Sequence, residues 1–118
     1  MQLTAISKHC LAKPGVTKGH PFGPGALVMK VGGKIFAIIG ESATPLEVSL
    51  KCEPEIARSL RKLHAAVRPG YHLNKQHWNT VTLDGTVPDR QVLDWVDDSY
   101  DLVVDTLPRR LRDEIESS

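Results

Sequence analysis

The sequence predicts an α+β protein in which helices cover one face of an antiparallel sheet. Three observations indicate this fold class: two β-rich runs meet at a Gly-Gly pair, a strictly alternating segment follows them, and three segments repeat apolar residues at helical spacing. The expected element order is α-β-β-β-α-β-β-α. We expect one domain over residues 1–118, in which residues 108–118 form a short, charged tail that frays.

The first half of the chain supplies one helix and three strands. Apolar residues at helical spacing predict a helix over residues 3–12, and the stretch HPFGPG at residues 20–25 is interpreted as a loop. The runs ALVMKV and KIFAIIG predict a β-hairpin, because Gly32 and Gly33 between them both tolerate positive φ. The segment LEVSLKC at residues 46–52 alternates apolar and polar side chains, which predicts a strand with one buried face.

The second half supplies two helices around a short β segment. Glu53-Pro54 opens the first helix, since proline in the first turn costs no hydrogen bond. Its apolar stripe is predicted to comprise Ile56, Leu60, Leu63 and Val67. After a turn at Pro69-Gly70, the segment HWNTVTL predicts a strand that Asp84-Gly85 ends. The longest amphipathic helix is expected from Pro88 to about Leu107.

Composition favours a cytoplasmic globular protein without a cofactor. Hydrophobic residues make up 41% and charged residues 25%, and the longest apolar run is far shorter than the roughly 20 residues that a membrane helix needs. The N-terminus has no signal-peptide core. Cys10 and Cys52 are expected to be free, half-buried thiols, and no zinc-binding spacing occurs. We therefore expect a monomer with no membrane, metal or cofactor partner.

The charged residues divide unevenly along the chain. Residues 1–80 hold 11 Lys and Arg against four Asp and Glu, whereas residues 81–118 hold four against ten. One reading is that these charges merely solvate the surface. The sharper reading is a basic face turned away from an acidic helix, which would attract a polyanion in spite of the net charge of +1.

A catalytic reading rests on His72 and His77, with Asp84 as a carboxylate that could orient them. No GxSxG nucleophile motif is present, and the Gly-Gly pair belongs to a hairpin rather than to a phosphate-binding loop. The acids of the last helix fall around more than one face, and most of them are therefore interpreted as solvated charges: Asp94, Asp97, Asp98 and Asp101. We expect a protein that is not an enzyme, and an enzyme that uses either histidine as a base stays open as a third alternative.

Nucleic-acid binding is the leading hypothesis, because it needs cations for phosphates and polar side chains for the backbone or the bases. Lysines flank the predicted hairpin, end a strand and line a helix together with arginines, and the PGYHLNKQHW stretch adds amides and imidazoles. The candidate DNA-binding residues are Lys30, Lys34, Lys51, Arg58, Arg61, Lys62, Asn74, Lys75 and His77.

The alternative hypothesis is a module that binds a small molecule or a protein. Its pocket would form between residues 20–24 and 71–78, where aromatic and polar side chains occur together. The candidate pocket residues are Phe22, Tyr71, His72, Asn74, His77 and Trp78.

Four stretches give the sequence a family resemblance: FGPGALVMKVGGKIFAII, SLKCEPEIARSLR, PGYHLNKQHWNTVTLDGTVP and SYDLVVDTLP. Together they resemble the MmcQ/YjbR family of small bacterial proteins from the first helix to Leu107, and residues 70–85 are the most specific part. The resemblance implies a YjbR-like fold similar to the secretion-chaperone-like or CyaY-like arrangement. It also implies DNA binding through a "double wing" surface without enzymatic activity. Leu73 stands where Met is common in the family, and Asp98 where His is frequent.

Overall fold

The structure is a computed structural model, and it describes residues 1–70 and 73–117. The helices are α1 (Leu3–Leu11), α2 (Pro54–Leu63), α3 (Asp89–Asp105) and α4 (Arg109–Glu116). The strands are β1 (Val16–Gly19), β2 (Ala26–Val31), β3 (Lys34–Gly40), β4 (Glu47–Lys51), β5 (Val67–Pro69) and β6 (Trp78–Thr82). The described helices are all too short or too polar to span a lipid bilayer.

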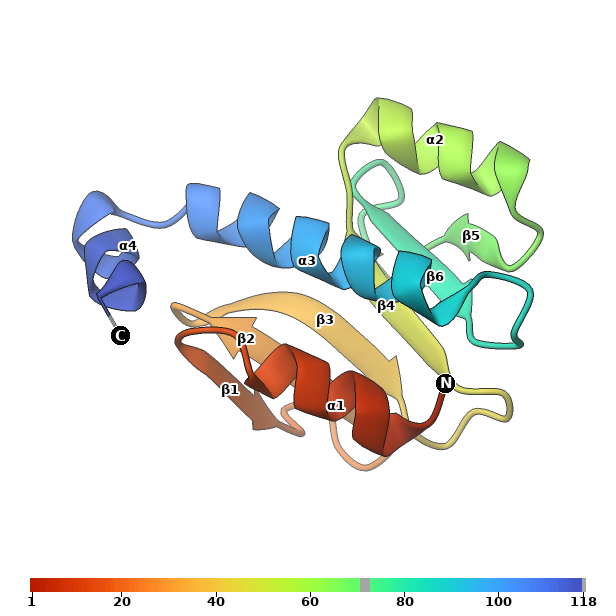
Figure 1. Cartoon of the computed structure of the whole chain (residues 1–118), viewed down its shortest axis with the longest axis horizontal. Helices are drawn as coiled ribbons and strands as arrows, with labels where there is room; N and C mark the ends of the chain where they lie inside the picture. Colours follow the sequence, from red (N-terminus) through yellow and green to blue (C-terminus); the bar gives the residue numbers. More distant parts are fainter. Residues whose placement is uncertain (71–72, 118) are drawn as a thin grey trace.

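The strands form one antiparallel sheet in the order β1-β2-β3-β4-β6-β5 (Figure 1). Apolar residues of α1 and α3 share one buried core with residues of the four inner strands, and Leu60 of α2 packs against that core. Alternation along the strands decides which residues enter this core: Val48 pairs with Val81 inside, whereas Ser49 pairs with Thr80 on the opposite face. The predicted α+β class with helices on one face of an antiparallel sheet is confirmed.

Three elements differ from the expected order. The structure adds strand β1, which is four residues long at a sheet edge and too short to show an alternating pattern. Residues 109–116, expected as a tail, form helix α4, whose Leu111 and Ile115 pack partly against the core. Helix α2 ends at Leu63, and Val67 begins the edge strand β5 instead of extending the helix.

The predicted apolar stripe of α2 is wrong not only because Val67 lies outside the helix but also because two of its other residues are exposed. Ile56 is 52% exposed and Leu63 is 74% exposed, and Ala57 is the buried residue of this helix. The periodicity correctly placed these apolar residues on one side of the helix. It could not show that the helix packs against the sheet through another side. The side chains of Ile56 and Leu63 therefore remain available at the surface.

The β2–β3 hairpin turns at the predicted glycines. It also contains a β-bulge, next to which a residue of α3 forms hydrogen bonds with the backbone. Gly32 and Gly33 have φ of +58° and +79°, in the left-handed region that glycine adopts readily. The β2–β3 register shifts after Met29, so that Phe36 becomes the extra residue of a β-bulge. On the other side of β3, the ladder with β4 reaches only to the pair Ala37–Leu50.

Ser99 of α3 fills the gap beyond that last pair. Its side chain is fully buried, and its hydroxyl accepts a hydrogen bond from the Lys51 N–H (2.9 Å) and donates one to the Phe36 carbonyl (2.5 Å). The next residue, Tyr100, sets its ring edge-on to Phe36 and donates its hydroxyl proton to the Pro14 carbonyl (2.5 Å). Two consecutive residues thus attach α3 to the sheet and to the segment that follows α1.

We expect Ser99→Ala to lower the free energy of unfolding by about 1–3 kcal/mol, because two buried backbone groups would lose their partner. Urea unfolding followed by circular dichroism measures the change. Ser59→Ala is the matched control: its hydroxyl bonds to the Glu55 carbonyl on the exposed side of α2, so its loss should stay within about 0.5 kcal/mol. Equal losses in the two variants would contradict the bridging role of Ser99.

Candidate functional site

The predicted DNA-binding residues come from four parts of the fold. Arg58, Arg61 and Lys62 lie on α2, and Lys30 and Lys34 lie on the β2–β3 hairpin. The remaining residues are Lys51, at the end of β4, and Asn74, Lys75 and His77, in the loop before β6.

Strand register brings the lysines to one end of the sheet. Because β3 and β4 are antiparallel and Ala37 pairs with Leu50, the start of β3 at Lys34 lies beside the end of β4. Lys51 in turn pairs with Trp78, the first residue of β6, which follows the loop that carries Lys75. We call this end, with Lys30, Lys34, Lys51 and Lys75, the basic end of the sheet.

The cations of the basic end are not neutralised by neighbours. Among the described residues, no ion pair includes Lys30, Lys34, Lys51 or Lys75, whereas Lys13, Arg68 and Arg90 each contact a carboxylate elsewhere. The ammonium group of Lys34 donates a hydrogen bond to the Thr106 hydroxyl (3.2 Å) and keeps its charge uncompensated. Alternation with the core residues Met29 and Leu50 directs Lys30 and Lys51 to the face without helices.

Arg61 forms hydrogen bonds inside the fold, whereas the other two cations of α2 are exposed. Its Nε donates to Oδ1 of the buried Asn79 (2.7 Å), and its terminal nitrogen Nη2 donates to the carbonyls of Lys75 and Trp78 (3.3 Å for Trp78). Asn79 also donates to the Ala57 carbonyl (3.3 Å). Arg61 therefore connects α2, β6 and the loop before β6, while Arg58 and Lys62 are exposed.

Asn74 and His77 shape the same loop through short-range hydrogen bonds. The side-chain oxygen of Asn74 accepts from the Gln76 N–H, and its carbonyl accepts from the N–H groups of His77 and Trp78. The His77 carbonyl accepts from Cys52, just beyond β4 (2.7 Å). Gly70 is needed beside this loop because a Cβ there would lie 2.8 Å from the Cβ of Trp78. These contacts hold Lys75 exposed at the tip.

The structure does not assemble the predicted pocket between residues 20–24 and 71–78. The loop at residues 20–25 joins β1 to β2 at one edge of the sheet, and residues 73–77 precede β6 near the other edge. The two segments also lie at opposite ends of their strands, and Phe22 is 64% exposed. Of the candidate pocket residues, Asn74, His77 and Trp78 stay together without Phe22. Tyr71 and His72, including the candidate base His72, lie outside the described residues.

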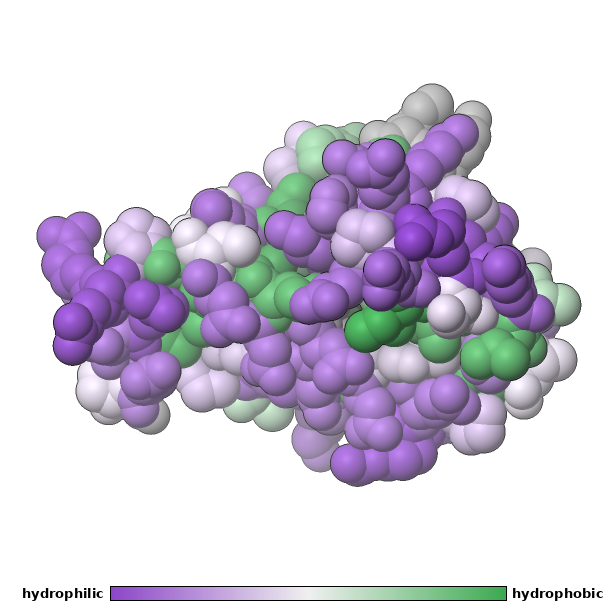
Figure 2. All heavy atoms as spheres, turned by 90° about the horizontal axis from the view of Figure 1, so that it is seen from above, coloured by the Kyte–Doolittle hydropathy of each residue, from purple (hydrophilic) through white to green (hydrophobic). Residues whose placement is uncertain are grey.

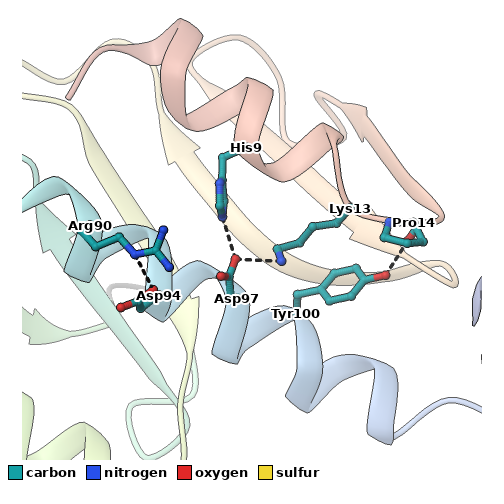
Figure 3. A network of polar contacts seen from close by, with 7 residues as sticks. All are labelled: His9, Lys13, Pro14, Arg90, Asp94, Asp97 and Tyr100. Carbon is teal, nitrogen blue, oxygen red and sulfur yellow. Dashed lines mark hydrogen bonds and ion pairs between the residues drawn. The ribbon is translucent and has the colours of Figure 1, made fainter.

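A polar network that the sequence did not indicate joins α1 to α3 (Figure 3). The carboxylate of Asp97 lies 2.6 Å from His9 Nε2 and 2.7 Å from Lys13 Nζ. Partial burial acts to raise the pKa of Asp97, but hydrogen bonds from Lys13 and His9, together with their charges, outweigh it and lower this pKa. Asp94 pairs with Arg90 within α3. Asp97 is therefore an exception among acids that were mostly interpreted as solvated charges, whereas the Asp94 pair is exposed at the surface.

The two cysteines are free thiols, as predicted, but Cys10 is fully buried and only Cys52 is half-buried. Their surroundings make them weak nucleophiles. Burial raises the pKa of Cys10 to about 12, and Asp97 adds to the effect. Burial and the nearby Asp98 carboxylate raise the pKa of Cys52. Because the thiolate is the reactive form, neither thiol is activated for attack.

We expect Asp97→Asn to lower stability at neutral pH by about 0.5 kcal/mol, since the pairs are partly exposed and screened by salt. The pKa of Asp97 is lower in the folded state than in the unfolded state, so its contribution is present above about pH 4 and disappears as the pH falls further. Thermal unfolding at pH 7 and at low pH measures the difference. Asp113→Asn, which breaks only a long exposed pair with Arg109, should show no such dependence. A wild-type advantage that persisted in strong acid would contradict this account.

We also expect Arg61→Ala to destabilise the protein by about 2 kcal/mol, because it leaves the buried Asn79 amide and two carbonyls without their donor. Arg58→Ala, one turn earlier on the same helix, should change stability by less than about 0.5 kcal/mol. Urea unfolding distinguishes the two. Similar values for both variants would show that the Arg61 contacts contribute little.

Comparison with known proteins places the chain among relatives of the same length and fold. The YjbR family model matches residues 11–102. YjbR of Escherichia coli K12, an uncharacterised protein, is 42% identical over 112 residues, which is 95% of each chain. YbdF of Escherichia coli O157:H7 is 36% identical over 85% of this chain and 82% of its own.

The crystal structure of Deinococcus radiodurans protein DR2400, a DUF419 domain, superposes with a TM-score of 0.93 at 36% identity, covering 98% of this chain and 88% of that one. A Pseudomonas syringae protein gives a TM-score of 0.74 at 27% identity, covering 86% of this chain and 98% of its own. The chain therefore belongs to the YjbR family, as the sequence resemblance indicated.

Proposed function

We propose that this chain is a cytoplasmic, non-enzymatic protein that binds the phosphate backbone of DNA at the basic end of the sheet. The observation that supports this proposal is that Lys34, Lys51 and Lys75 lie at the same end of the sheet, with Lys51 on the helix-free face and Lys34 on the helical side. They come from three separate segments, and the described residues offer no carboxylate partner to any of them. Such unpaired cations are available to a polyanion without first breaking an internal pair.

Electrostatics would provide most of the affinity in this mode of binding. Each phosphate that a lysine neutralises releases condensed counterions, so the logarithm of the binding constant should fall with the logarithm of the salt concentration by about 0.9 per contact. Lys30 and Lys51 on the helix-free face and Lys75 at the loop tip would contact successive phosphates. The acidic residues of α3 lie on the helical side and do not oppose an approach from the helix-free face.

We expect the wild-type protein to bind a fluorescein-labelled random duplex at about 50 mM salt and to lose affinity steeply towards about 200 mM. The double variant Lys51→Gln/Lys75→Gln should bind more weakly and with a smaller salt slope, because up to two phosphate contacts are lost. Fluorescence anisotropy measures both quantities.

Lys8→Gln/Arg90→Gln is the control that removes the same charge elsewhere. Both residues are exposed, and they lie on α1 and in the first turn of α3. This variant should bind as the wild type does. No binding at low salt, or equal weakening in both double variants, would overturn the proposal, since net charge rather than the basic end would then explain any association.

A further inference from the structure

A groove runs between α2 and α3 on the helical side of the sheet, and we call it the α2–α3 groove. It consists of two adjoining cavities of about 60 and 300 Å³. Both cavities are lined by Cys52, Ile56 and Asp98. The inner cavity also contacts Leu50, Val81 and Trp95, and the outer one Asp101, Leu102 and Asp105.

The inner part of the groove is mostly apolar, with Lys51 and Asn79 among its lining residues. Ile56 is half exposed here because α2 rests on the sheet through Ala57 and the Arg61–Asn79 contacts rather than through its apolar side. The imidazole of His64, at the end of α2, meets the Trp95 ring edge-on at 5.4 Å between centroids and connects the two walls. Figure 2 shows separate hydrophobic patches among hydrophilic residues when the molecule is seen from above.

The outer part of the groove carries a row of carboxylates without an ion-pair partner among the described residues. Asp98, Asp101 and Asp105 follow one another at spacings of three and four along α3, where like charges repel. The last turn of α3 contains no basic residue of its own, and the cation at the negative end of the helix dipole is Lys34, which bonds to the C-cap residue Thr106. In the part of the chain that the structure describes, none of these three carboxylates forms an ion pair, although Asp94 and Asp97 on the same helix do. Burial, followed by the charges of Asp101, Asp94 and Asp97, raises the pKa of Asp98.

We propose that the α2–α3 groove binds a small amphipathic organic cation, with its apolar group beside Trp95 and its ammonium or guanidinium group against Asp98 and Asp101. An apolar floor that ends at unpaired carboxylates is complementary to such a ligand in both shape and charge. A metal ion fits less well, because the three carboxylates are spread over about 10 Å of helix and no three His, Cys, Asp or Glu side chains of the described residues could share an ion. The groove adjoins the basic end at Lys51, but the proposal does not depend on DNA binding.

The test uses three probes that separate apolar from ionic recognition. Tryptamine carries an indole and an ammonium group, indole-3-propionate carries the same ring with a carboxylate, and putrescine carries two ammonium groups without a ring. In ¹H–¹⁵N NMR titrations we expect tryptamine to shift the amides of Leu50, Cys52 and Val81 and the indole N–H of Trp95. We expect indole-3-propionate to leave them unchanged and putrescine to affect mainly the amides around Asp101.

Variants then test the carboxylates. Asp98→Asn/Asp101→Asn should bind tryptamine about tenfold more weakly, the effect of losing one charge-assisted hydrogen bond. This variant should fold normally, because it relieves repulsion on α3. Asp94→Asn/Asp113→Asn removes the same charge outside the groove and should bind as the wild type does. Absence of tryptamine shifts, equal shifts by indole-3-propionate, or unchanged binding by Asp98→Asn/Asp101→Asn would overturn the proposal.

Discussion

The hydrogen bonds between Arg61, Asn79 and the loop before β6 fix the position of α2, and both candidate binding surfaces depend on that position. A helix placed by apolar packing would have turned Ile56 and Leu63 into the core. Here a buried amide and a guanidinium group meet beneath the helix instead, so the apolar side chains remain beside the groove. The same guanidinium group orders the loop that presents Lys75. Polar groups buried in this way stabilise a fold only when all their partners are present, which makes the arrangement specific as well as fragile.

Some polar residues of α3 attach the helix to the rest of the fold, and others face the groove at the surface. Ser99 and Tyr100 attach it to the sheet, and Asp97 attaches it to α1. Asp98 and Asp101 lie on the side towards α2, where the described residues form no ion pair with them. Neighbouring residues of one helix thus have opposite electrostatic surroundings: Asp97 has a lowered pKa, and Asp98 has a raised one. Such an uncompensated carboxylate costs stability, which is reasonable where a ligand supplies the missing charge.

Several features were predictable because they depend on local chain chemistry. The Gly32-Gly33 turn, the alternating strand around Val48 and the long helix that includes Val96 and Tyr100 all agree with the sequence patterns. The extent and side of α2 were not predictable. Its stripe of apolar residues is genuine, but Asn79 and Arg61 are far apart in sequence, and no periodicity shows that they will meet. Strand β1 and helix α4 were missed because each is short and depends on neighbours for its packing.

The sequence by itself determined the fold class, the family and the number of basic residues. These depend on turn glycines, on the alternation of apolar and polar residues, and on the order of motifs, all of which are local features of the chain. Only the tertiary structure decided which charges are free. Strand register brings the start of β3 at Lys34 to the same end of the sheet as Lys51. Helix packing pairs Asp97 with His9 and Lys13, and no ion pair forms at Asp98 among the described residues. It also separated Phe22 from Trp78 by placing them near opposite edges of the sheet. The physical reason is that charge compensation depends on distance in space, and residues far apart in the sequence become neighbours only through the pairing of strands and the docking of helices.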